Sequence, residues 1–120
     1  MQDYHKLTVW SRAMDLAENC YAATRCFPTT ERFGIASQMN RSAVSIPANI
    51  AEGCGRGTNR DFARFLRMAY ASACELETEA LIAKRVGLSE PAPLEQLIDE
   101  VNEVRRMLNG LVKQVAATAD

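Results

Sequence analysis

Residues 45–56 read Ser-Ile-Pro-Ala-Asn-Ile-Ala-Glu-Gly-Cys-Gly-Arg. This segment places a proline inside a helical pattern of apolar residues and then closes the pattern with glycines. Pro47 cannot donate a hydrogen bond to the carbonyl of Ala43 and crowds that turn, which costs roughly 3 kcal/mol in an ordinary helix interior. Because the apolar spacing continues on both sides of Pro47, the segment predicts one kinked helix.

Outward from this segment, apolar residues recur every three or four positions in four stretches, which predicts α-helices over about 8–26, 31–53, 58–86 and 91–117. No period-two run predicts a strand. Four long helices with short connections are typical of an antiparallel up-down-up-down bundle, and a chain of this length forms one all-α domain. Each helix has one row of residues that we expect in the core. In the first helix the row is Trp10, Ala13, Ala17, Cys20, Thr24 and Phe27, with Met14 and Tyr21 beside it, and in the second it is Ala36, Met39, Ala43, Ile46 and Ile50. In the third helix it is Phe62, Leu66, Ala69, Ala73, Leu76, Ala80 and Ala83, and in the fourth it is Leu94, Leu97, Val101, Val104, Leu108, Leu111 and Val115.

Local signals support the ends of these helices. Thr58 and Asp61 form a T-x-x-D start, Pro91 suits the first turn of a helix, and Gly87 suits a left-handed helix end.

The charge is spread unevenly, although the net formal charge is only −1. Residues 32–67 hold six positive and two negative side chains, whereas residues 75–103 hold two positive and eight negative ones. This asymmetry predicts two electrically different surfaces.

Several classes of protein are disfavoured by the composition. The first residues show no apolar signal run and no stretch is long enough to span a membrane, so we expect a cytoplasmic protein. The four cysteines are scattered, which favours reduced thiols over disulfides or a zinc site. His5 is the only histidine, so neither a di-iron bundle nor a Ser–His or Cys–His pair is available, and we expect no cofactor, no metal and no enzyme activity.

A second, polar row runs beside the apolar row of the second helix. It could face water, form a hydrogen-bonded seam against another helix or another subunit, or line a small-ligand site. Its members, at steps of four and three, are Gln38, Ser42, Ser45, Asn49 and Glu52.

An arginine row follows the glycine-rich turn, with Arg56, Arg60, Arg64 and Arg67 at steps of four, four and three. The planar guanidinium donates two parallel hydrogen bonds to a phosphate, so the row could contact a phosphate backbone. Alternatively, it is a solvated face that pairs with the acidic later half. The turn itself does not follow a strand and lacks the G-K-[ST] ending, so it does not predict a nucleotide-binding loop.

The chain resembles the four-helix bundle proteins of the 23S ribosomal RNA intervening-sequence family over about residues 7–115. The motifs that carry the resemblance are Phe27-Pro28, Glu31, Gln38, Arg41-Ser42-Ala43, residues 45–53, Arg56, residues 65–69 and residues 75–78. One departure is Ala71-Ser72, where the family usually has Gly-Ser.

The resemblance implies a homo-oligomer, a pentameric ring with a central channel. Related accessory variability determinant proteins of retroelements share this build and present a basic surface to nucleic acid and to a reverse transcriptase. Carried over, Gln38, Asn49 and Glu52 would lie in polar packing, and Arg41, Arg56, Arg60 and Arg64 would supply the basic surface. The leading hypothesis is therefore a non-catalytic oligomer that binds RNA or DNA. The alternatives are an assembly factor for a protein partner such as a reverse transcriptase, without direct nucleic-acid binding, and a small enzyme.

Overall fold

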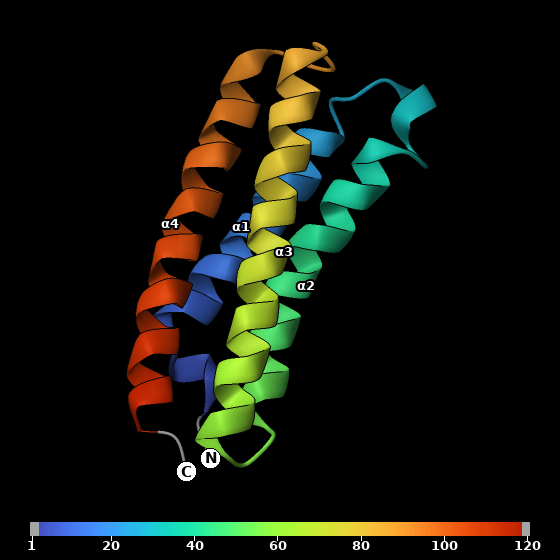
Figure 1. Cartoon of the computed structure of the whole chain (residues 1–120). Helices are drawn as coiled ribbons and strands as arrows, with labels where there is room; N and C mark the ends of the chain where they lie inside the picture. The colour runs from blue at the N-terminus through green and yellow to red at the C-terminus, as the bar shows by residue number, and fades with distance from the viewer. Residues whose placement is uncertain (1–2, 119–120) are drawn as a thin grey trace.

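In a computed structural model that describes residues 3–118, the chain forms four long helices, and these residues contain no strand (Figure 1). The helices are α1 (Thr8–Thr24), α2 (Ile35–Cys54), α3 (Asn59–Arg85) and α4 (Pro91–Ala117). Short 3-10 helices η1 (Tyr4–Lys6) and η2 (Thr29–Glu31) precede α1 and α2. Successive helices alternate in direction along an elongated body of 47 × 21 × 19 Å, which confirms the predicted four-helix fold (Figure 1).

The helix ends follow local chemistry, with one correction. Thr58 Oγ1 accepts a hydrogen bond from the Asp61 N–H at 3.1 Å, Pro91 begins α4, and Gly87 has a φ of +71°. The predicted start of the second helix at residue 31 is wrong, since α2 begins at Ile35. Residue 34 has φ −101° and ψ −120°, outside the helical region, so the short turn η2 does not continue into α2.

The apolar rows of α2, α3 and α4 form one core. Every residue predicted for the rows of α2 and α3 is buried, and so are those of α4 except the half-buried Leu111. Within this core α3 packs most extensively, against α2 on one side and α4 on the other. Its four row alanines are fully buried and let the neighbouring helices approach closely.

The row of α1 is only partly as predicted. Val9 and Leu16 are buried there, whereas Met14 and Tyr21 each expose 45% of their surface. Trp10 lies beside the core, with its ring 5.2 Å from that of Tyr4 and 5.3 Å from that of His5.

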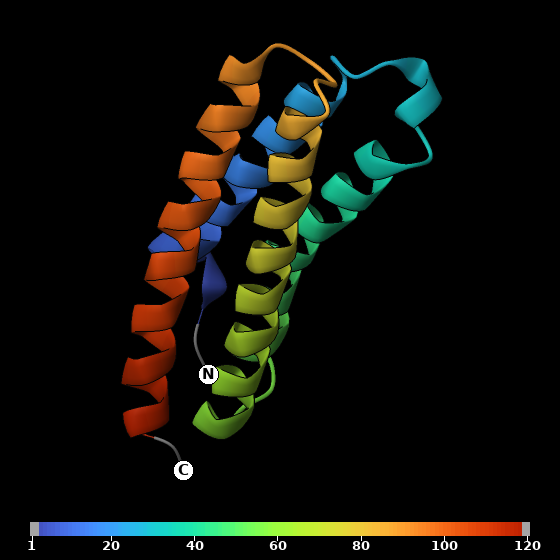
Figure 2. The ribbon, with the colours of Figure 1, turned by 45° about the horizontal axis from the view of Figure 1, so that its top comes forward.

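Helix α2 is continuous through the buried Pro47. The kink at Pro47 stays a prediction. Figure 2 shows the N-terminal half of α2 leaning away from α3, with the segment that contains η2 projecting from the body of the bundle. Within residues 3–118, no helix combines the length and apolarity that crossing a membrane requires.

Candidate functional site

Two of the predicted arginines meet on one aromatic ring. The guanidinium carbons of Arg56 and Arg64 lie 5.0 Å and 4.6 Å from the centre of the Phe65 ring. Phe65 is only 5% exposed, so its ring is held in place by packing while both cations lie against it. Guanidinium groups over an aromatic face gain about 0.5–1 kcal/mol at exposed sites, enough to bias their orientation.

Gly53 makes this arrangement possible. A Cβ atom at Gly53 would lie 2.8 Å from the Phe65 Cβ and 3.0 Å from a ring carbon of Phe62. The end of α2 therefore packs directly on the start of α3, and a side chain at residue 53 would fit only if α3 shifted.

Both stacked arginines also have weak ionic neighbours. Arg64 Nε lies 3.6 Å from Asp61, and Arg56 lies 3.9 Å from Glu52. These side chains are about half exposed, and such pairs contribute little free energy. The two guanidinium groups therefore remain able to bind an incoming anion.

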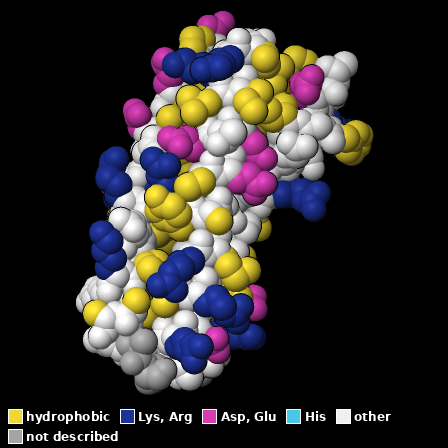
Figure 3. All heavy atoms as spheres, viewed as in Figure 1, with side chains coloured by type: hydrophobic (Ala, Val, Ile, Leu, Met, Phe, Trp, Pro, Cys, Tyr) yellow, Lys and Arg dark blue, Asp and Glu magenta, His cyan; other side chains and the backbone are white. Residues whose placement is uncertain are grey.

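Arg60 and Arg67 complete this end of the bundle. Both are exposed, and neither has an ion-pair partner among residues 3–118. Figure 3 shows Lys and Arg side chains gathered near the end of the bundle where α2 turns into α3. We call Arg56, Arg60, Arg64 and Arg67 the basic patch.

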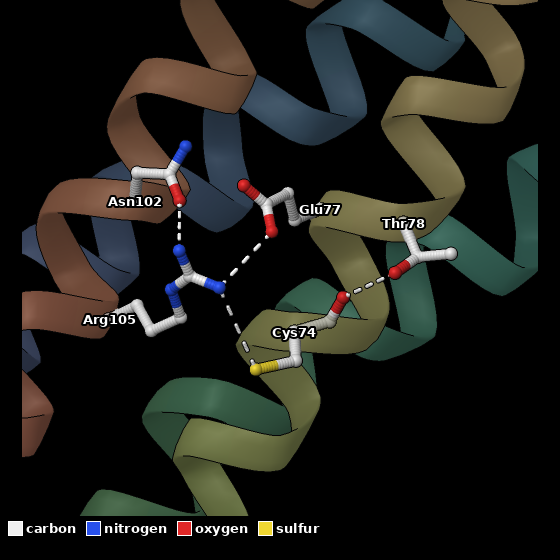
Figure 4. A network of polar contacts seen from close by, with 5 residues as sticks. All are labelled: Cys74, Glu77, Thr78, Asn102 and Arg105. Carbon is white, nitrogen blue, oxygen red and sulfur yellow. Dashed lines mark hydrogen bonds and ion pairs between the residues drawn. The ribbon is translucent and has the colours of Figure 1, made fainter.

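The acidic stretch of residues 75–103 forms no ion pair with the basic patch within the described residues. Its carboxylates use other cations: Glu77 pairs with Arg105, Glu95 with Lys84, and Glu103 with Arg12. Figure 4 shows the first of these pairs, in which Arg105 donates to Glu77 at 3.2 Å and to Asn102 at 2.7 Å and so links α4 to α3. The arginine row is thus exposed to solvent, as one of its two alternatives expected, but the pairing with residues 75–103 that this alternative also expected does not occur within residues 3–118.

Arg41 lies apart from the basic patch. Ser42, its neighbour on α2, is level with Glu75 of α3, to which its hydroxyl donates at 3.2 Å. Arg67, the member of the basic patch nearest to this level, lies eight residues before Glu75 on α3, roughly 12 Å at 1.5 Å per residue, and Arg64 lies roughly 16 Å before it. The expectation that Arg41 shares a surface with the other arginines therefore lacks support within one protomer.

The polar row of α2 forms a hydrogen-bonded seam with α3 over its middle part. Besides the bond from Ser42, the hydroxyls of Ser45 and Ser72 lie 2.8 Å apart. Asn49 donates to the Ser45 carbonyl at 2.8 Å and to its hydroxyl at 3.0 Å. The two ends of the row, Gln38 and Glu52, are exposed. The middle of the row therefore forms a hydrogen-bonded seam, whereas its ends face solvent.

A cleft of about 510 Å³ opens beside this seam between α2 and α3, lined by Gln38, Arg41, Ser42, Ser45, Glu75 and Glu79. Glu79 Oε1 is buried and has no hydrogen-bond partner within residues 3–118. The pKa of Glu79 is raised, mainly because burial disfavours the charged carboxylate. A hydrogen bond from the Ser42 hydroxyl lowers this pKa in part, and the negative charge of Glu75 raises it further. Two carboxylates one turn apart thus line a partly enclosed space together with one cation, Arg41, which forms no ion pair with either of them within residues 3–118.

We expect Glu79→Gln to stabilise the protein at pH 7 by about 1 kcal/mol, because it replaces a partly buried carboxylate by a neutral amide of the same shape and so removes the cost of burying the charge. The raised pKa in the folded state means that the folded chain holds this proton more tightly than the unfolded chain. The stability that protonation gives is complete below the unfolded pKa and is lost as the pH rises through the folded pKa. The gain from Glu79→Gln should therefore shrink between pH 7 and pH 4, measured by urea unfolding.

The control for this prediction is Glu18→Gln, which changes an exposed carboxylate of α1. It should have little effect on stability at either pH. A Glu79→Gln effect that is equal at both pH values would contradict the buried-carboxylate argument.

No group of three or more acidic, histidine or cysteine side chains suited to a metal occurs in the described part of the chain. The four cysteines are free, Cys20 and Cys54 being buried and Cys26 exposed. Burial raises the pKa of Cys20 to about 12 and also raises the pKa of Cys54, which disfavours the reactive thiolate form of both at neutral pH.

Comparison with known proteins adds a family and a fold. A model of the family described as 23S rRNA-intervening sequence protein matches residues 5–110. A crystal structure of a protein from Bacteroides thetaiotaomicron VPI-5482, described as of unknown function and from the S23 ribosomal protein family, superposes with a TM-score of 0.82. The two chains share 22% sequence identity over 88% of this chain and 99% of the other, so this likeness concerns the fold. Neither description names a catalytic activity, and no curated protein matches.

Proposed function

This chain belongs to the 23S rRNA-intervening sequence protein family, and from that premise we propose that it is a non-catalytic protein that binds nucleic acid through the basic patch. The observation that carries the proposal is the pair of guanidinium groups of Arg56 and Arg64 held on the buried ring of Phe65. Arg60 and Arg67 add two exposed cations on the same end of the bundle.

The arrangement favours phosphate as the partner. An arginine whose face rests on an aromatic ring keeps its N–H edge available, and this edge matches two phosphate oxygens. Holding the side chain in place beforehand lowers the entropy that binding costs. The Thr58 hydroxyl already occupies the Asp61 N–H at the start of α3, so the arginines rather than the helix end would make the contacts.

We further propose that the protein is a cytoplasmic homo-oligomer, a pentamer in keeping with its family resemblance. Exposed apolar side chains support a covered outer surface: Val44 on α2, and Met68 and Ile82 on α3, each expose between 44% and 47% of their area. Repetition of the basic patch around a ring would turn individually weak contacts into a strong multivalent surface. Light scattering tests this part on its own, since a solution mass equal to one protomer would contradict it.

The test of nucleic-acid binding compares two double variants that lose the same charge. Arg60→Ala with Arg67→Ala removes the two members of the basic patch without ion-pair partners among the described residues, whereas Arg85→Ala with Arg106→Ala removes two exposed arginines elsewhere. Fluorescence anisotropy with labelled structured RNA and duplex DNA should show at least a tenfold loss for the first variant. Its slope of log K against log salt should fall by about 1 per lost phosphate contact.

The outcomes separate the two hypotheses. Equal affinity and equal salt dependence of the two double variants would overturn the proposal. Wild-type protein that ignores naked nucleic acid, yet captures a protein partner through Arg60 and Arg67, would favour the accessory-factor alternative instead.

A further inference from the structure

A second pocket with different chemistry lies at the opposite end of the bundle from the basic patch. It is formed where the end of α1, the segment around η2 and the start of α2 meet, the region that projects from the bundle in Figures 1 and 2. Its volume is about 280 Å³, and its lining includes Tyr21, Thr24, Arg25, Phe27, Arg32 and Asn40. This volume is close to the lower end of small-ligand pockets, about 300 Å³.

The walls of this pocket combine apolar rings with positive charge. Tyr21 lines the pocket and is 45% exposed, and the buried Phe27 adds apolar surface. Two arginines line the pocket, and among residues 3–118 no carboxylate does. A ligand that satisfies these walls therefore has a planar apolar part and a negative charge.

Both arginines are steadied from within the chain. Arg25 Nε donates to the Tyr21 carbonyl at 3.3 Å, which leaves its two terminal nitrogens available. The guanidinium of Arg32 lies 5.2 Å from the ring centre of Phe33, whose side chain is 87% exposed.

The polar part of the lining has unused donors. The Asn40 side-chain oxygen accepts from Thr24 Oγ1 at 3.1 Å and from Cys20 Sγ at 3.5 Å. These two bonds orient the amide, and its NH₂ group has no hydrogen-bond partner within residues 3–118. An oriented amide beside an aromatic wall suits the edge of a base, which offers ring-nitrogen and carbonyl acceptors.

We propose that this pocket binds one nucleotide, with its base against Tyr21, the base edge at the Asn40 amide, and the phosphate at Arg25 and Arg32. Stacking on an aromatic side chain contributes about 1–3 kcal/mol per base in single-strand binding proteins. An inorganic anion would leave the aromatic wall unused, and an apolar ligand would leave the arginines unused. The site extends the proposed nucleic-acid function to unpaired bases, but its argument is independent of the basic patch.

The nucleotide can be free or part of a strand, and the test distinguishes the two. Isothermal titration of the full chain uses the four ribonucleoside monophosphates, the matching nucleosides, inorganic phosphate and a single-stranded tetranucleotide. We expect at least one monophosphate to bind at least tenfold more tightly than its nucleoside and than phosphate. Tighter binding of the tetranucleotide would identify a strand as the source, whereas equal or weaker binding would identify the free nucleotide.

Four variants locate the binding. Tyr21→Ala and Arg32→Ala should each weaken monophosphate binding at least tenfold, whereas Tyr21→Phe, which keeps the ring, should retain it. Arg85→Ala removes an exposed arginine at the same end of the bundle but outside the pocket and should have no effect. Far-UV circular dichroism checks that each variant is folded, which the exposure of Tyr21, Arg32 and Arg85 leads us to expect.

The proposal is overturned if no monophosphate binds, if phosphate alone binds as tightly, or if Tyr21→Ala binds like wild type. The Arg60→Ala and Arg67→Ala double variant should keep monophosphate binding while it loses structured RNA. Failure of the pocket and failure of the basic patch therefore give different results.

Discussion

Replacement of Leu76 by alanine is expected to lower the free energy of unfolding by about 2–5 kcal/mol. Leu76 is fully buried in the middle of α3, the helix with the most extensive packing in the bundle. Its removal leaves a cavity that α2 and α4 cannot close without moving away from their other contacts with α3. The loss is therefore expected in the upper part of this range.

Leu81→Ala is the matched control for this prediction, because it makes the same change on the same helix at a side chain that is 42% exposed. Its expected loss is below about 1 kcal/mol, since surface substitutions usually change stability little. Urea unfolding followed by circular dichroism measures both values. Equal losses would contradict the division of α3 into a buried and an exposed face.

Much of the core could be predicted because helical periodicity is a local property. Each apolar residue of the α3 row, from Phe62 to Ala83, has its partners one turn away on the same helix, and the row has to face the interior as a unit. The start of α3 was equally predictable, since the Thr58 cap involves residues only three positions apart.

The orientation of α1 could not be predicted in the same way. Its sequence offers two adjacent apolar faces, and packing decides between them. Val9 and Leu16 are buried, whereas Met14 and Tyr21 remain half exposed. The contacts that decide the matter come from elsewhere in the chain, among them Asn40 of α2, which accepts from Cys20 and Thr24.

The candidate site was predictable only where spacing along one helix determines it. The steps from Arg60 to Arg67 place these arginines on one side of α3, but whether Arg41 joins them depends on how α2 and α3 align. Phe65 was missed as a functional residue, since it looks like another apolar residue beside the core row. The sequence does place Phe65 directly after Arg64, which could have indicated a contact between the two side chains. The contact with Arg56 could not be predicted, because only the approach of α2 brings Arg56 to the ring.

Gly53→Ala is expected to lower stability although it replaces a helical glycine by the best helix former. The gain in helix propensity is about 0.5–1 kcal/mol. The added Cβ would lie 2.8 Å from the Phe65 Cβ, an atom close to the backbone that cannot move without shifting α3. Such overpacking costs about 1–3 kcal/mol, and because a backbone-linked Cβ cannot give way easily we expect the upper part of this range, which leaves a net loss of about 1–2.5 kcal/mol.

Gly55→Ala is the matched control, two residues further along. Its Cβ would meet its nearest neighbour, the Glu52 carbonyl oxygen, at an ordinary 3.5 Å, and its φ of −83° suits alanine. This variant is expected to be more stable than wild type by about 0.4–1 kcal/mol, through a less flexible unfolded chain. Two identical changes two residues apart should thus have opposite signs in thermal and urea unfolding.

The same pair of variants links the fold to the proposed function. A shift of Phe65 in Gly53→Ala moves the ring on which Arg56 and Arg64 rest, so its affinity for nucleic acid should fall several-fold at a temperature where the variant is still folded. Gly55→Ala leaves the ring in place and should bind like wild type. If Gly53→Ala lost stability but kept full affinity, the stacked arginines would not be the binding element, and the remaining contacts of Arg60 and Arg67 would have to account for all of it.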